Sequence, residues 1–126
     1  MDSETCHFWA GTYASIEDFT GLFVETYSDD DDTPISPFAE TQRETFYDHD
    51  FLEYGYSDDS KSLEELVQDY SYSDEWLQDF KLLVESLMLT HVNAFVFITD
   101  AEIGDPQDIE STKGNLRYLG TISYNI

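Results

Sequence analysis

The hydrophobic pattern of the chain is clearest between residues 74 and 99. Over residues 74–89, apolar side chains recur at spacings of three and four, and polar side chains fill the other positions. This period is that of a helix with one buried face. Residues 93–99, NAFVFIT, are continuously apolar in the middle, which is typical of a strand buried on both faces. We predict a helix near 74–89, capped by Ser73, and a central strand near 92–99.

Helix start signals precede three further apolar segments, because each segment follows a serine suited to cap a helix. The caps are Ser15, Ser36 followed by Pro37, and Ser62 with Glu65 three residues later. These signals predict helices near 16–26, 37–44 and 63–70.

Two other segments are rich in aromatic or β-branched residues, TCHFWAGTY and LRYLGTISYNI. They predict strands near 5–13 and 116–126, and the last two strands of the chain could form a hairpin around a long polar loop. The predicted fold is therefore α+β, with a small, mostly antiparallel sheet packed with helices. A length of 126 residues fits one domain, residues 1–126.

The stretch FYDHDFLEYGYSDD, residues 46–59, mixes aromatic residues and carboxylates almost residue by residue. It lacks clean periodicity, so we interpret it as an extended segment or an ordered loop. In an extended segment successive side chains point to opposite faces. Phe51 favours the odd-numbered face as the core side, which predicts four outward-facing residues: Asp48, Asp50, Tyr54 and Tyr56.

Charge restricts the possible partners. The chain has 28 Asp and Glu against 5 Lys and Arg, giving a formal net charge of −23. Nucleic acid and anionic membranes carry the same sign, whereas a basic protein complements it. A surface adapted to high salt is the alternative reading. However, residues 25–59 hold 12 acidic residues and only one basic residue, Arg43, and an adaptation to salt would spread more evenly.

The sequence offers little for catalysis or metal binding. Cys6 is the only cysteine and sits beside His7 in a predicted strand, so the two side chains point to opposite faces. Asp48, His49 and Asp50 are suitable ligand types, but an extended backbone turns the histidine away from the carboxylates. The chain has no Gly-rich phosphate loop, nucleophile elbow or HExxH motif. We expect no catalytic residue, metal or cofactor.

The N-terminal residues lack the basic start and apolar run of a signal peptide, and no segment approaches 18 apolar residues. We expect a cytoplasmic protein.

Five tyrosines sit among carboxylates between residues 47 and 75, and tyrosine is enriched at protein interfaces. Burial is an equal alternative for any single one of them, but the cluster favours an interface. The predicted partner-binding residues are Tyr47, Asp48, Asp50, Glu53, Tyr54, Tyr56, Asp58 and Asp59.

Three stretches, HFWAGTYAS, SPFAETQRETFYDHDFLE and NAFVFI, resemble immunity protein 22 of bacterial polymorphic toxin systems. The matching positions are Phe8, Trp9, Gly11, Ser36, Phe38, Tyr47, Asp48, Asp50, Phe51 and Glu53. The resemblance implies a small cytoplasmic α+β protein that binds and neutralises a cognate toxin domain, often a nuclease. An acidic protein would suit the basic, phosphate-binding groove of such a toxin. The alternative is a DNA mimic that inhibits a DNA-binding protein.

Overall fold

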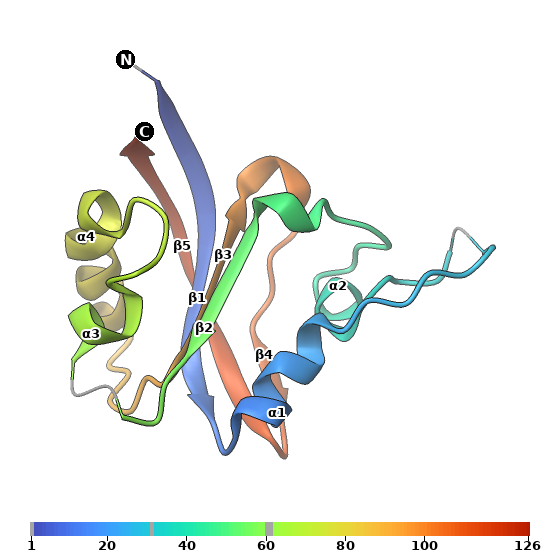
Figure 1. Ribbon diagram of the computed structural model, residues 1–126, viewed down its shortest axis with the longest axis horizontal. Helices are drawn as coiled ribbons and strands as arrows, with labels where there is room; N and C mark the ends of the chain where they lie inside the picture. Colours follow the sequence, from blue (N-terminus) through green and yellow to red (C-terminus); the bar gives the residue numbers. More distant parts are fainter. Residues whose placement is uncertain (1, 31, 60–61) are drawn as a thin grey trace.

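Within residues 2–30, 32–59 and 62–126, which are those that the structure describes, five strands form one antiparallel sheet in the order β2-β3-β1-β5-β4 (Figure 1). The strands of this computed structural model are β1 (Ser3–Tyr13), β2 (Leu52–Tyr56), β3 (Ala94–Thr99), β4 (Ile109–Ser111) and β5 (Gly114–Asn125). Together with the helices, the sheet confirms the α+β class. The first strand of the chain lies at the centre, between β3 and β5.

Both faces of the sheet are covered. Figure 1 shows α3 (Leu63–Val67) and α4 (Ser73–Ser86) on one face, and α1 (Ile16–Thr20) and α2 (Pro37–Thr41) on the other. Along β1, Phe8 joins the core under α4, whereas Trp9 joins the core under α1 and α2. An interior strand therefore needs apolar residues on both sides, which explains the continuous apolar run in β3.

Three predicted serine caps are confirmed, whereas the cap predicted at Ser73 is wrong: Ser73 is the first residue of α4, and its hydroxyl donates to the carbonyl of Gln68. The hydroxyl oxygens of Ser15, Ser36 and Ser62 each accept a hydrogen bond from the backbone N–H three residues later, at 3.1–3.2 Å. These bonds satisfy N–H groups that have no partner inside the helix.

The helix ends differ from those predicted. The first helix becomes a 3-10 turn at Gly21–Phe23 instead of reaching residue 26. Helix α2 stops at Thr41 because Arg43 adopts a left-handed conformation with φ 62°. Helix α4 ends at Ser86, and Met88 just beyond it takes the same conformation, with φ 60°. In both cases the next N–H bonds back to a carbonyl five residues earlier.

The predicted hairpin between the last two strands is wrong. Strand β3 pairs with β1 and β2, and β5 pairs with β1 and β4. Strand β4 lies in the region that we expected to be a loop. The β1–β5 pairing contains a register shift beside Phe8, and Gly120 there has φ 119°. The shift places Ile122 and Tyr124 on the α4 side with Leu119, although regular alternation would put them on the side of Leu116.

Candidate partner-binding surface

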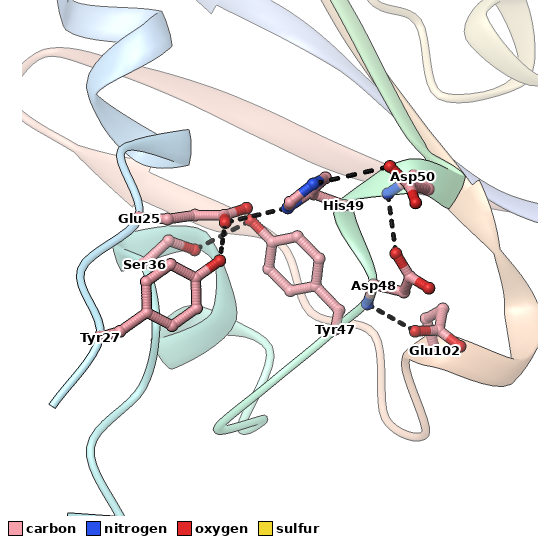
Figure 2. Close-up of polar contacts among 8 residues, drawn as sticks. All are labelled: Glu25, Tyr27, Ser36, Tyr47, Asp48, His49, Asp50 and Glu102. Carbon is pink, nitrogen blue, oxygen red and sulfur yellow. Dashed lines mark hydrogen bonds and ion pairs between the residues drawn. The ribbon is translucent and has the colours of Figure 1, made fainter. Parts of the chain in front are cut away.

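The acidic and aromatic stretch folds as a tight turn followed by an edge strand. Residues His49–Phe51 form a 3-10 turn, η2, and β2 follows directly at the edge of the sheet. The carboxylate of Asp48 caps the turn by accepting a hydrogen bond from the N–H of Asp50 at 3.0 Å. The N–H of Asp48 donates in turn to the carboxylate of Glu102 at 2.6 Å (Figure 2). This turn interrupts the alternation expected of an extended segment.

Because of this interruption, the predicted assignment of faces is wrong for the aromatic rings. Tyr54 packs inward and stacks on Phe23, with ring centroids 4.0 Å apart and planes 9° apart. Tyr56 packs on the same core and lies 6.2 Å from the ring of Phe19. Phe51, expected to mark the core side, is 50 % exposed. Tyr54 and Tyr56 therefore cover the core beneath α1, whereas Phe51 does not.

Tyr47 is also a core residue, with only 1 % of its surface exposed. Its hydroxyl lies 3.0 Å from the hydroxyl of Ser36, the cap of α2 (Figure 2). Burial raises the pKa of Tyr47 above its ordinary value. Its side chain therefore positions α2 and is not available on the partner-binding surface.

The predicted carboxylates fall into two groups, one at each end of β2. Asp48, Asp50 and Glu53 lie around the turn, whereas Asp58 and Asp59 follow the strand. A five-residue strand is about 17 Å long, so these two groups are separate. The side chain of Asp50 is 81 % exposed. At the far end of β2, a hydrogen bond with Asp58 raises the pKa of Tyr56 to about 12.

His49 links the turn to the chain that follows α1. Its Nδ1 lies 3.1 Å from Oε1 of Glu25, and its Nε2 lies 3.6 Å from Oδ1 of Asp50 (Figure 2). The hydroxyl of Tyr27 donates to the same Glu25 carboxylate. The hydrogen bond and charge of Glu25 raise the pKa of His49, with smaller contributions from the neighbouring aspartates. Sequence reasoning missed Glu25 because it lies 24 positions before its partner.

Lys and Arg ion pairs lie away from the carboxylates of this surface. In the described part of the chain, the ion pairs of Lys and Arg side chains lie elsewhere, as Arg43–Asp105, Lys81–Glu64 and Arg117–Asp108. Among the described residues, the basic side chain that forms an ion pair with a carboxylate of η2 is His49. We call the surface formed by Asp48, Asp50, Glu53, Asp58 and Asp59 the acidic edge.

Two other reactive side chains have structural contacts. His7 bonds to the hydroxyl of Tyr118 at 2.8 Å and to the carbonyl of Ile103 at 3.0 Å, so both ring nitrogens are engaged. Burial raises the pKa of the Cys6 thiol to about 11, which disfavours the reactive thiolate. Within the described ranges, no group of three or more His, Cys, Asp or Glu side chains could hold a metal ion.

Together, the fold and the acidic edge define a small acidic α+β domain with one charged sheet edge. The family description Immunity protein 22 matches residues 6–125. The chain therefore belongs to the immunity protein 22 family, as the resemblance predicted. Membership indicates a toxin as partner and the role of an inhibitor rather than an enzyme.

Neither the curated proteins nor the solved structures contain a match to this chain. Among the described residues, no helix has the length and apolar character needed to cross a membrane.

Proposed function

We propose that this protein binds a basic toxin domain, a nuclease, through the acidic edge and thereby neutralises it in the cytoplasm. The observation that carries the proposal is the cluster of carboxylates at η2 and after β2, because the Lys and Arg ion pairs of the described residues lie elsewhere, in a member of an immunity-protein family. The basic side chains that are paired lie elsewhere on the described surface. The acidic edge is therefore free to meet the Lys and Arg side chains of a partner.

A nuclease groove is basic because it binds phosphates. An acidic partner is attracted to such a groove over a distance, which raises the association rate. Covering the groove, or a neighbouring surface, would block access of the nucleic acid. Neutralisation of this kind needs no catalytic residue in the inhibitor.

The aromatic part of the proposed surface differs from the sequence prediction. Tyr54 and Tyr56 support β2 from the core side, and Tyr47 is buried. Phe51 and Tyr72 are instead about half-exposed. They supply the apolar contact area that interfaces combine with charge.

The test uses two variants that each make the net charge three units more positive. Asp48→Asn with Asp50→Lys changes the acidic edge, and the asparagine keeps the oxygen that caps η2. Asp79→Lys with Glu110→Gln changes exposed positions on α4 and β4 and serves as the control. Association with the cognate toxin domain is measured by stopped-flow fluorescence at several NaCl concentrations, and toxin activity is measured on nucleic acid.

We expect the edge variant to associate at least tenfold more slowly and with a weaker dependence on salt, while its melting temperature stays close to that of the control. Equal association by both variants would refute the acidic edge as the binding surface. Inhibition of several unrelated DNA-binding proteins would favour a DNA mimic over an immunity protein. A toxin that is neutralised but does not cleave nucleic acid would refute the nuclease assignment.

A further inference from the structure

A second feature of the acidic edge lies on the α4 side of the sheet. A hollow of about 190 Å³ opens between the start of β1, the turn η2 and the residues before α4. Its apolar lining includes Cys6, Phe97 and Tyr124, which are all buried. Pockets for drug-sized ligands have volumes of roughly 300–1,000 Å³, so this hollow suits one side chain rather than a whole small molecule.

Three carboxylates line the hollow, and each comes from a different element. They are Glu4 of β1, Asp50 of η2 and Glu53 of β2. None of the lining residues that the structure describes is basic. A group that enters this hollow therefore meets three carboxylates from separate parts of the chain, of which Asp50 also lies 3.6 Å from His49.

Two of these carboxylates are held in place by neighbours. Glu4 accepts a hydrogen bond from the hydroxyl of Thr99 at 2.6 Å. Glu53 accepts one from the backbone N–H of Ser71 at 3.2 Å. In the described structure these bonds reach one oxygen of each carboxylate, and an ionised carboxylate can accept at its second oxygen as well. The carboxylates are thus pre-organised to receive a donor, which lowers the entropy lost on binding.

Two half-exposed aromatic rings complete the hollow. Phe51 is 50 % exposed and Tyr72 is 49 % exposed. Tyr72 adopts φ 56° at the residue before α4, a conformation that is rare for a bulky side chain. Its ring lies 6.0 Å from the ring of Tyr124. Large apolar side chains exposed beside a hollow are typical of binding surfaces.

We propose that this hollow receives one arginine side chain from the partner. A planar guanidinium can stack on an aromatic ring while its rigid fork of N–H groups donates to two carboxylate oxygens. A lysine ammonium also has several donors, but it has neither the planar face nor the fixed fork. The occupant is assigned by charge complementarity, by the aromatic rings and by the small volume. This inference deepens the proposed function, on which it rests for the identity of the partner, but the site itself can be tested on the free protein.

The test is a titration of the ¹⁵N-labelled full chain, followed by NMR amide shifts at constant ionic strength. The probes are N-acetylarginine amide, N-acetyllysine amide and the neutral isostere N-acetylcitrulline amide. We expect the arginine probe to shift the amides of Glu53, Ser71 and Tyr72 saturably, with a dissociation constant in the millimolar range. The lysine probe should bind at least threefold more weakly, and the citrulline probe should not saturate.

Two variants assign the interaction to the hollow. Glu53→Gln keeps an oxygen for the N–H of Ser71 but removes the charge, and Phe51→Ala removes one ring. Each should weaken the arginine probe at least fivefold, whereas Glu110→Gln on β4 should leave it unchanged. The spectra themselves show whether each variant is folded.

An arginine probe that causes no saturable shift, that citrulline matches, or that binds Glu53→Gln as tightly as the unchanged protein would overturn the arginine site. None of these results would bear on toxin neutralisation, which the charge variants of the acidic edge decide separately. Conversely, a saturating arginine probe together with failure of the toxin assay would support the hollow and refute the proposed partner.

Discussion

Replacing Gln42 by methionine should destabilise the fold, although the two side chains have similar shapes. Gln42 is fully buried at the end of α2, and its amide bonds to both backbone groups of Gln107. Its Oε1 accepts the Gln107 N–H at 2.6 Å, and its Nε2 donates to the Gln107 carbonyl at 3.0 Å. The indole of Trp9 also donates to that carbonyl, at 2.9 Å. Methionine would therefore leave the Gln107 N–H without its acceptor, whereas the carbonyl would keep one donor.

A backbone donor left unsatisfied costs about 1–3 kcal/mol. For a chain of this length that loss corresponds to a fall in melting temperature of about 4 °C per kcal/mol. Urea unfolding followed by tryptophan fluorescence measures the change, and Trp9 places a reporter beside the lost bond. Gln107→Ala is the matched control, because only the main chain of Gln107 bonds to Gln42 and its side chain makes an exposed hydrogen bond to the carbonyl of Asp105; the change should cost about 0.5 kcal/mol or less. Equal stability of the two variants would refute the reasoning.

Three further predictions concern the packing, the charge and the histidine of the acidic edge. Tyr54→Ala should lower the free energy of unfolding by at least about 1 kcal/mol, because it loses the stacked contact with Phe23, yet leave the rate of toxin association within twofold. A slower association with unchanged stability would contradict this division. The melting temperature should rise as NaCl increases from 0.01 to 0.1 M, because the Debye length falls from about 30 to about 10 Å and screens the charge of −23; a flat curve would contradict it. His49→Gln should be less stable than the unchanged protein at pH 6, and the difference should shrink towards pH 8.5. The folded state raises the pKa of His49 above 6.5, so its stabilising contribution is complete below that pH and is lost as pH rises through the raised pKa. A constant difference in melting temperature would argue against the pair with Glu25.

The parts of the fold that the sequence predicted are those set by local chemistry. The serine caps of α1, α2 and α3 and the apolar run of β3 each act through neighbouring residues, and these are present in the structure. The ends of α2 and α4 were missed because Arg43 and Met88 take the left-handed conformation that usually marks a glycine. The position of β1 between β3 and β5 depends on pairings across the whole chain, which no local pattern encodes.

In the candidate site, too, local sequence patterns did not predict the contacts between distant residues. The sequence identified the acidic stretch and its carboxylates, but the aromatic residues were assigned to the wrong faces. The error arose at one point, where Asp48 caps a turn and shifts the phase of the strand by its 3-10 geometry. An aspartate that bonds the N–H two residues later is a known turn signal, so Asp48 could have indicated a turn at this point. Glu4 and Tyr72 belong to distant segments and reach the hollow only through the folded sheet.

Within residues 46–59, some side chains stabilise the core and others are exposed, so the partner could change without loss of the fold. Tyr47 and Tyr54 are tied to the core by packing, so substitutions there should act mainly on stability. Asp50 and Phe51 lie exposed on the turn, where substitutions usually change stability by less than about 0.5 kcal/mol. Specificity depends on the difference in affinity between partners, and one added or removed charge at an interface is enough to shift it. Discrimination between toxins should therefore be set at the turn, while the tyrosines behind it keep the edge strand in place.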